Sequence, residues 1–272
     1  MNPKALLDSY QIHPKKSLGQ NFLHDPNALE KIITVAELMP DDTVLEIGPG
    51  TGMLTARLAQ AVRRVVTVEV DDRLHPVLDV QLATYRNIEL IIADFLDTDV
   101  NALVKTDDYI VVANVPYYIT SAILRHLLEA TPRPRRIVLT VQIEVAERLV
   151  AQPGDMSLLA VSAQFYAQAR IKARLNPAVF WPRPEVSSAV VRLDTYPQPP
   201  VAVPSEQAFF RVVRAGFGQK RKQLKNALGD GLGLDAAAAA ALLERVGIDP
   251  RRRAETLSLE EWAALTRAHA DV

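Results

Sequence analysis

The chain has no cysteine among its 272 residues. This absence excludes a disulfide-stapled scaffold, a thiol nucleophile and a zinc site built from cysteine thiolates. The five histidines are scattered along the chain, so we expect no metal site at all. No run of 18 apolar residues occurs, and the polar N-terminus lacks the apolar stretch of a secretory signal. We therefore expect a cytoplasmic protein with no membrane span.

The chain also lacks an excess of either charge sign. Its 31 Lys+Arg residues against 32 Asp+Glu residues give a formal net charge of −1. Such a balance argues, weakly, against a protein that coats nucleic acid. Hydrophobic residues make up 49% of the chain, enough for a sizeable core, and the length favours one or two domains.

Short apolar runs alternate with helical patterns through the first two thirds of the chain. Strands are predicted at 43–47, 64–70, 88–93, 109–113 and 136–141, with later strands at 160–167 and 187–193. Helices are predicted at 26–38, 53–61, 74–84, 121–130 and 145–151. The strand segments are continuously apolar, which is typical of parallel strands buried on both faces. The alternation predicts right-handed βαβ units in an α/β, doubly wound, Rossmann-like sheet.

Residues 195–204 contain four prolines, which indicates a linker. Beyond it the sequence predicts helices alone, at 206–217, 221–228, 235–246 and 258–270. We therefore predict a catalytic domain at 1–198, beginning with a polar arm at 1–26, and a small all-helical domain at 199–272.

A glycine-rich loop, EIGPGTG at 46–52, follows the first strand and precedes a helix. Glycines such as Gly48 and Gly50 let the backbone turn sharply and approach a ligand closely. A loop of this kind serves NAD, FAD and S-adenosylmethionine alike. Glu69 ends the second strand, 21 residues after Gly48, where a carboxylate can accept hydrogen bonds from both hydroxyls of a ribose.

The third strand ends in Asp94 and Phe95. Asp94 can accept a hydrogen bond from an adenine amino group, and Phe95 can pack on the ring. An aspartate in this position is also a common N-cap of a helix.

The fourth strand ends in Asn114-Val115-Pro116-Tyr117, which favours a methyltransferase over a dehydrogenase. The exocyclic amine of a nucleobase is a poor nucleophile, because its lone pair delocalises into the ring. The Asn114 side-chain oxygen and the Val115 carbonyl can accept from its N–H groups, while Pro116 stiffens the turn and Tyr117 stacks on the base. Positioning and electrostatic stabilisation then carry the catalysis, without a side-chain nucleophile.

An adenine in structured RNA must leave its stack to reach such a pocket. The proline-rich segment 179–188 offers Phe180 and Trp181 to receive it. We predict that Phe180 stacks on the face of the base opposite Tyr117, although either aromatic could instead fill the core.

Taken together, these motifs resemble the ribosomal RNA adenine N6,N6-dimethyltransferase family, in particular its bacterial small-subunit members. The matching pieces are KSLGQNFL at 16–23, the loop 46–52, Glu69, Asp94, Asn114–Tyr117, the loop 180–188 and FGQKRKQL at 217–224. The resemblance spans about residues 10–230. The segment at 152–158 is shorter than the corresponding stretch usually is in that family.

The resemblance implies a class I S-adenosylmethionine-dependent methyltransferase that releases S-adenosylhomocysteine. It further implies that the N-terminal arm folds over the cofactor, with Asn21 and Leu23 in contact with it. Contacts from Gly48, Glu69, Asp94 and Asn114 are implied as well. The implied substrate is a pair of neighbouring adenines in the 3′-terminal hairpin of small-subunit (16S) rRNA, each receiving two methyl groups late in subunit assembly.

A basic run in the helical domain is the predicted RNA-binding surface. Residues 201–228 contain six basic side chains and one acidic one. The basic members are Arg211, Arg214, Lys220, Arg221, Lys222 and Lys225. Phosphate contacts by such residues would be salt-dependent and largely independent of sequence.

Other functions remain as alternatives. A large-subunit rRNA adenine methyltransferase of the antibiotic-resistance type would share the cofactor motifs, and a non-catalytic RNA-binding assembly factor could keep the fold. A NAD-dependent dehydrogenase would leave residues 114–117 and the basic run unexplained. We expect the small-subunit enzyme, acting as a monomer.

Overall fold

The structure is a computed structural model that describes residues 2–219 and 221–270, with only the backbone of Tyr117. It divides into two compact units, each described here by itself. Unit 1 comprises Met1–Ala146 and Gln168–Thr195, and unit 2 comprises Glu147–Ala167 and Tyr196–Val272. Compared with the boundary predicted at 198/199, residues 147–167 belong with the helical unit.

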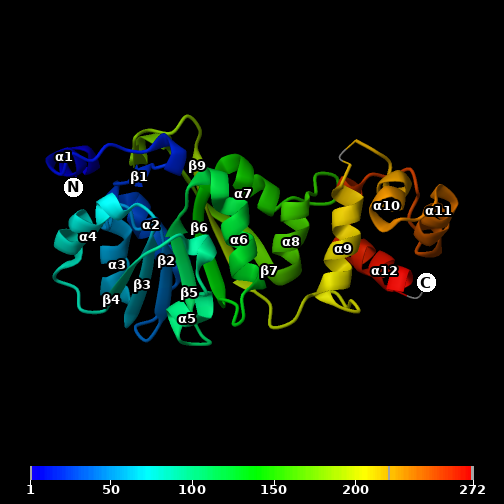
Figure 1. Ribbon diagram of the computed structural model, residues 1–272, viewed down its shortest axis with the longest axis horizontal. Helices are drawn as coiled ribbons and strands as arrows, with labels where there is room; N and C mark the ends of the chain where they lie inside the picture. The colour runs from blue at the N-terminus through cyan, green and yellow to red at the C-terminus, as the bar shows by residue number, and fades with distance from the viewer. Residues whose placement is uncertain (1, 220, 271–272) are drawn as a thin grey trace. The chain divides into compact units, whose positions relative to one another are not determined.

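Unit 1 is built on a seven-stranded sheet in the order β4-β3-β2-β5-β6-β9-β7 (Figure 1). Its strands are β2 (Thr43–Ile47), β3 (Arg64–Glu69), β4 (Ile88–Ile92), β5 (Ile110–Asn114), β6 (Arg136–Gln142), β7 (Ala167–Leu175) and β9 (Ser188–Thr195). β2 to β6 pair in parallel, whereas β9 runs antiparallel to β6. The predicted Rossmann-like α/β sheet is confirmed, and the strand predicted at 187–193 is found as β9. The apolar runs did not indicate its antiparallel direction.

Helices flank this sheet, and a separate two-stranded ribbon carries the N-terminal arm. The helices are α1 (Pro3–Ser9), α2 (Pro26–Ala36), α3 (Met53–Ala61), α4 (His75–Leu82), α5 (Val100–Val104) and α6 (Thr120–Glu129), and α7 (Ile143–Leu149) crosses into unit 2. The ribbon pairs β1 (Phe22–Leu23) with β8 (Phe180–Trp181). The predicted start of α2 is confirmed, because Asp25 accepts a hydrogen bond from the Ala28 N–H at 2.8 Å and Pro26 opens the helix.

The hydrophobic core of unit 1 explains why its strands read as unbroken apolar runs. Val44, Val112 and Val138 from three neighbouring strands are fully buried in one cluster with side chains of α2 and α3. Helices therefore shield the central strands from water, as parallel strands require.

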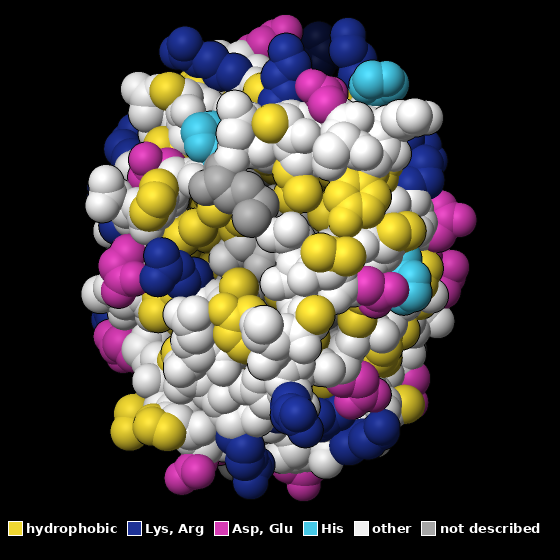
Figure 2. Space-filling view, turned by 90° about the vertical axis from the view of Figure 1, so that its left-hand side faces the viewer, with side chains coloured by type: hydrophobic (Ala, Val, Ile, Leu, Met, Phe, Trp, Pro, Cys, Tyr) yellow, Lys and Arg dark blue, Asp and Glu magenta, His cyan; other side chains and the backbone are white. Residues whose placement is uncertain are grey.

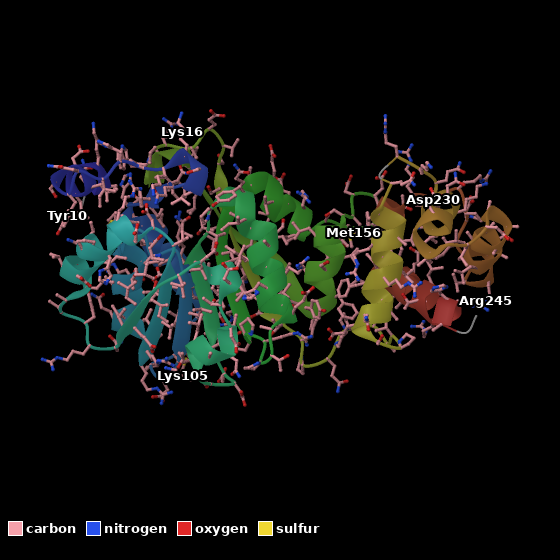
Figure 3. All side chains as sticks on the ribbon, viewed as in Figure 1. Tyr10, Lys16, Lys105, Met156, Asp230 and Arg245 are labelled. Atoms are coloured by element: carbon pink, nitrogen blue, oxygen red, sulfur yellow. The ribbon has the colours of Figure 1, made fainter. Side chains whose placement is uncertain are left out.

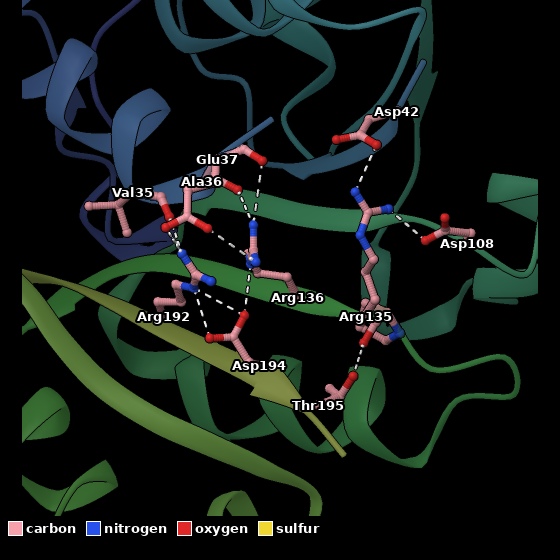
Figure 4. Close-up of polar contacts among 11 residues, drawn as sticks. Val35, Ala36, Glu37, Asp42, Asp108, Arg135, Arg136, Arg192, Asp194 and Thr195 are labelled. Carbon is pink, nitrogen blue, oxygen red and sulfur yellow. Dashed lines mark hydrogen bonds and ion pairs between the residues drawn. The ribbon is translucent and has the colours of Figure 1, made fainter. Parts of the chain in front are cut away.

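The amino-terminal edge of the sheet is held by a network of arginines and carboxylates (Figure 4). Arg136, at the start of β6, donates to the Asp194 carboxylate at 2.8 Å and to the Ala36 carbonyl at 2.8 Å. Arg192 pairs with the same Asp194 at 2.8 Å and with Glu37 at 2.5 Å. These contacts fix the end of α2 to the start of β6 and to the end of β9.

The strand predicted at 160–167 is wrong, because these residues belong to helix α8 (Leu158–Tyr166). Ser157 caps that helix by accepting from the Ala160 N–H at 3.2 Å. The strand begins only at residue 167 and becomes β7, whose side chains alternate between exposed and partly buried. Arg170 and Lys172 are exposed on this edge strand, where charge discourages pairing with other chains.

The described residues of unit 2 form helices and connecting loops, apart from Ala167, which begins β7. Besides α8 the unit contains α9 (Glu206–Phe217), α10 (Leu224–Leu232), α11 (Ala236–Arg245) and α12 (Leu259–Ala270). Phe165 of α8 stacks on Phe209 of α9 with ring centroids 4.4 Å apart, which explains why residues 147–167 pack with the later helices. The start of α12 is a reciprocal cap, in which Ser258 and Glu261 exchange hydrogen bonds of 2.8 and 3.2 Å.

Helices α9 and α10 cross so closely that only glycine fits at the contact. A Cβ on Gly231 would lie 2.5 Å from the Cβ of Ala215 and 2.7 Å from its Cα. These atoms belong to or adjoin the backbone, so they cannot move aside cheaply.

We therefore expect Gly231→Ala to destabilise the protein, although alanine favours a helix by about 1 kcal/mol over glycine. Overpacking typically lowers the free energy of unfolding by about 1–3 kcal/mol, and here we expect it to outweigh the helix-propensity gain. Urea unfolding followed by circular dichroism measures the effect. Asn226→Ala, on the exposed side of α10, is the matched control and should be nearly neutral. A higher midpoint for Gly231→Ala than for the parent would contradict the packing argument.

Candidate active site

A cleft opens at the carboxyl ends of β2, β3, β4 and β5. Its walls bound about 980 Å³ of space, a figure that includes the open mouth. Ten residues singled out in the sequence line it: Asn21, Leu23, Gly48, Gly50, Glu69, Asp94, Phe95, Asn114, Val115 and Pro116. Segments far apart in the sequence thus meet at one edge of the sheet, where open α/β sheets bind their ligands.

The glycine-rich loop forms one wall of this cleft. Gly48 and Gly50 have φ angles of 73° and 58°, in the left-handed region that favours glycine. A Cβ on Gly50 would lie 2.9 Å from the ring of Phe22, so the N-terminal arm packs directly on the loop. A side chain at either position would strain the turn, and one at Gly50 would also push the arm away.

Glu69 is held rigidly at the tip of β3. One carboxylate oxygen accepts from the Gly50 N–H at 3.1 Å and the other from the Asp71 N–H at 2.9 Å. The side chain is 4% exposed, and this burial raises its pKa. Each oxygen keeps a second lone pair, so the group can still accept hydroxyl hydrogens from a ribose.

Glu46 also lines the cleft, although the sequence gave no reason to single it out from the loop. It is 1% exposed, and its Oε2 has no hydrogen-bond partner among the residues that the structure describes. Burial, helped by the nearby Glu69, raises the pKa of Glu46 to about 7, although the Thr55 and Thr67 side chains act in the opposite direction. An unpartnered buried acceptor beside a cleft fits a ligand that carries hydroxyl or ammonium groups, as S-adenosylmethionine does.

Asp94 and Phe95 line the cleft just beyond β4. Asp94 accepts from the Leu96 N–H at 3.0 Å and so caps the short 3-10 helix at Phe95–Asp97. This cap uses one of its two carboxylate oxygens. Phe95 is 4% exposed and meets the edge of His126 with ring centroids 5.1 Å apart. Packing therefore fixes its position at the cleft.

Asn114 lies at the tip of β5 with its amide group already oriented. Its Nδ2 donates to the Asn21 carbonyl of the arm at 3.1 Å. The planar amide then points Oδ1 away from the arm. Tyr117 follows in a short 3-10 helix with Tyr118 and Ile119, but the Tyr117 side chain lies outside the described part of the structure. Tyr118, to which the sequence assigned no role, is 61% exposed.

The structure does not place Phe180 beside the cleft. Its side chain is 2% exposed and belongs to the core cluster that includes Leu29 and Ile32 of α2. The cause is the pairing of β8 with β1, in which Phe180 lies opposite Leu23. The neighbouring Trp181 stacks on Phe22 at 6.4 Å. In this arrangement Phe180 has no free face for a nucleobase.

The basic run lies on unit 2, around a hollow between α9 and α10. Arg211 and Arg214 line this hollow together with Asp230. Arg221 and Lys222 are exposed, and Lys225 is partly buried. Lys220 lies outside the described residues.

Asp230 gives the run a carboxylate that the sequence segment lacked. Lys222 lies 3.3 Å from Asp230, and the Gln219 amide donates to it at 2.5 Å. Asp230 and Arg245 are labelled in Figure 3, on α10 and α11.

The surface of unit 1 near α1 and α4 mixes polar and hydrophobic side chains. Figure 2 shows hydrophobic side chains toward the middle of this face, and Lys, Arg, Asp and Glu mostly around its rim. Among the described residues, none of the helices combines the length and the apolar character needed to cross a membrane.

The sheet order, the glycine-rich loop after its first parallel strand and the acidic residue after the next define the fold of class I S-adenosylmethionine-dependent methyltransferases. Within that class, the chain belongs to the ribosomal RNA adenine dimethylase family, whose model matches residues 12–271. The family membership confirms the resemblance drawn from the motifs and excludes a dehydrogenase.

Individual relatives agree with this membership. The chain is 44% identical to "Ribosomal RNA small subunit methyltransferase A" of Dehalococcoides mccartyi strain 195, over 98% of this chain and 92% of the relative. It is 42% identical to the protein of the same name from Clostridium botulinum, with both chains fully covered.

Two solved structures have the same fold over nearly the whole chain. A dimethyladenosine transferase from Plasmodium falciparum gives a TM-score of 0.77 at 27% identity, covering 90% of this chain and 95% of that one. The 23S rRNA methyltransferase ErmE gives 0.73 at 29% identity, covering 91% and 99%.

The raised pKa of Glu46 makes a signed prediction about stability. The folded state binds the proton more tightly than the unfolded state, whose pKa is near 4.5. The free energy of unfolding should therefore fall as pH rises from about 4.5 to about 7, by up to about 3 kcal/mol. Glu46→Gln, which stays neutral, should lose this dependence.

Urea unfolding at about pH 5 and about pH 8 measures the difference between parent and variant. Glu30→Gln, at an exposed position of α2, is the control and should retain the parent's pH dependence. Parallel pH profiles for the parent and Glu46→Gln would show that Glu46 is ionised at both pH values.

Proposed function

We propose that this protein transfers methyl groups from S-adenosylmethionine to the N6 atoms of two adjacent adenines in the 3′-terminal hairpin of small-subunit (16S) rRNA. The observation that carries the proposal is the position of Asn114 and Val115 at the tip of β5, where both line the cleft. The names of the relatives at 42–44% identity favour the small-subunit substrate over the large-subunit one.

The cleft offers groups suited to each part of the cofactor. Glu69 would accept the ribose hydroxyls, and the Asp94 oxygen not used by its N-cap would accept from the adenine amino group. Gly48, Gly50 and the arm residues Asn21 and Leu23 would enclose the remainder. When bound, S-adenosylmethionine supplies an electrophilic methyl group and leaves as S-adenosylhomocysteine.

The chain's own contribution to catalysis is the positioning of the target amine. The Asn114 Oδ1 and the Val115 carbonyl would accept from its two N–H groups and so favour a pyramidal nitrogen with a localised lone pair. Pro116 donates no hydrogen bond and fixes the turn that aims both acceptors. Binding and orientation of this kind can lower the barrier without covalent catalysis.

Aromatic residues beside this motif would receive the flipped base. Tyr117 is the predicted stacking residue, and the exposed Tyr118 next to it presents a further aromatic surface. Phe180 would take part only if β8 moved away from β1, because its side chain is buried.

The helical unit would supply the phosphate contacts. Arg211, Arg214 and Arg221 are exposed, whereas Lys222 is already paired with Asp230. We therefore propose unit 2 as the main RNA-binding part, with Lys220 and Lys225 completing the surface. Action as a monomer stays a prediction.

Transfer of labelled methyl groups to small ribosomal subunits that lack the modification tests the proposal. Digestion of the product should yield dimethyladenosine. Label confined to large-subunit rRNA would instead support the large-subunit alternative. Cofactor binding without label in either subunit would support a non-catalytic assembly factor.

In the same assay, Asn114→Ala should abolish transfer, because it removes one acceptor for the target amine. Its affinity for S-adenosylmethionine should stay within about tenfold of the parent, or roughly 1.4 kcal/mol. Calorimetric titration measures that affinity. An active Asn114→Ala enzyme would refute the proposed role of the amide.

For RNA binding, Arg221→Ala should weaken affinity and reduce the slope of log K against log salt by about 1. Lys222→Ala should have a smaller effect, because Asp230 already neutralises part of its charge. Arg245→Ala, at an exposed position of α11, is the control. Equal slopes for Arg221→Ala and the control would place the RNA on another surface.

A further inference from the structure

Within the N-terminal arm, residues 13–23 lead to the cleft and are fastened beside it. Residues 18–23 of the arm line it directly. Two separate sets of hydrogen bonds hold the arm to the sheet, one at Gln20 and one at Asn21. The first set centres on Asp71, which none of the motifs singled out.

Asp71 is a buried carboxylate just beyond β3. Its side chain has no exposed surface, and it accepts from the Gln20 amide at 2.8 Å. Arg73 donates to both carboxylate oxygens, at 2.8 and 2.6 Å, and reaches the His13 carbonyl of the arm at 3.3 Å. The Lys15 ammonium lies 3.7 Å away. One carboxylate therefore gathers contacts that lead to three positions of the arm.

Gln20 uses both ends of its amide. Its Oε1 accepts from the backbone N–H of Lys15 at 2.8 Å, which shapes the arm, while its Nε2 donates to Asp71. The Arg73 guanidinium beside Asp71 holds the pKa of that carboxyl at about 2, so the acceptor stays charged at neutral pH. Charge-assisted hydrogen bonds of this kind are stronger than neutral ones.

Asp71 also connects the arm to the cleft in a second way. The backbone N–H of Asp71 donates to Glu69, the carboxylate proposed to hold the ribose. At the next residue along the arm, the Asn21 carbonyl accepts from Asn114 Nδ2 and thereby sets which way Asn114 Oδ1 points. Displacing the arm would free the Asn114 amide to rotate.

We infer that Gln20 and Asp71 are positioning residues that fasten the arm over the cleft and, through Asn21, fix the catalytic orientation of Asn114. The inference rests on the proposed function for the role of Asn114, but the fastening itself does not. One network then couples retention of the cofactor to alignment of the group that receives the target amine.

Gln20→Glu is the sharpest test, because it keeps size and the acceptor for Lys15 while it faces Asp71 with a second carboxylate. In the cofactor-free enzyme, trypsin should cut after Lys15 or Lys16 at least about tenfold faster than in the parent. Lys16 is labelled in Figure 3, on the exposed side of the arm. Affinity for S-adenosylhomocysteine should also fall about tenfold, roughly 1.4 kcal/mol.

The double variant Gln20→Glu with Asp71→Asn restores an amide–carboxylate pair with the partners exchanged. It removes the repulsion between two carboxylates but also takes the charged partner from Arg73, so it should recover part of the protection from trypsin and of the affinity lost in Gln20→Glu. Gln168→Glu, the same change at an exposed position of β7, should behave like the parent. Unchanged cleavage in Gln20→Glu, or no recovery in the double variant, would overturn the fastening.

Methyl-transfer kinetics test the link to Asn114 and the proposed function separately from the fastening of the arm. At saturating S-adenosylmethionine, kcat of Gln20→Glu should still be lower than that of the parent, because Asn114 loses its fixed orientation. A change in KM alone would overturn the link to Asn114. If the parent itself modifies no small subunit, the proposed function fails, while the cleavage and affinity data still decide the fastening.

Discussion

The parallel pairing of β2, β3, β4 and β5 is the constraint on which the site depends. In this register Ile47 lies opposite Val68, and Glu69 lies opposite Ile92. Parallel strands end on the same side of a sheet, so the polar residues that follow each apolar run must meet there. If β3 slipped by one residue against β2, every β3 side chain would turn to the opposite face of the sheet. Glu69 would then be separated from the glycine-rich loop.

The two ends of the parallel strands differ in how their polar side chains are paired. Where the parallel strands begin, arginines pair with carboxylates, as Arg192 does with Asp194 and Glu37. At the carboxyl edge, Glu46 and Glu69 are buried with spare hydrogen-bonding capacity. Burying an acceptor without a donor costs free energy, so this capacity is a feature to be expected where a ligand binds.

Much of the fold and of the cleft could be predicted because the information is local. The strand at 43–47 and the helix at 53–61 are found as predicted, since apolar runs and glycine punctuation act over a few residues. The cleft residues followed from parallel strands ending together. The strand predicted at 160–167 is wrong because helix α8 is as apolar as a buried strand.

The remaining features depend on contacts between distant segments. Phe180 is buried because β8 pairs with β1, some 158 positions away along the chain, and no local pattern announces that pairing. Likewise the pairing of Lys222 with Asp230 and the role of Asp71 appear only once separate elements have folded together. The near-zero net charge proved uninformative about nucleic acid, because it averages a local basic run with acidic segments elsewhere.

The placement of the tryptophans has a consequence for spectroscopy. The chain has two, Trp181 in β8 beside the arm and Trp262 in α12, where it is fully buried against Gly216. Each compact unit therefore carries its own intrinsic fluorophore. Replacing either one by phenylalanine would leave an emission signal that follows the melting of a single unit, so the independence of their unfolding can be read without any added label.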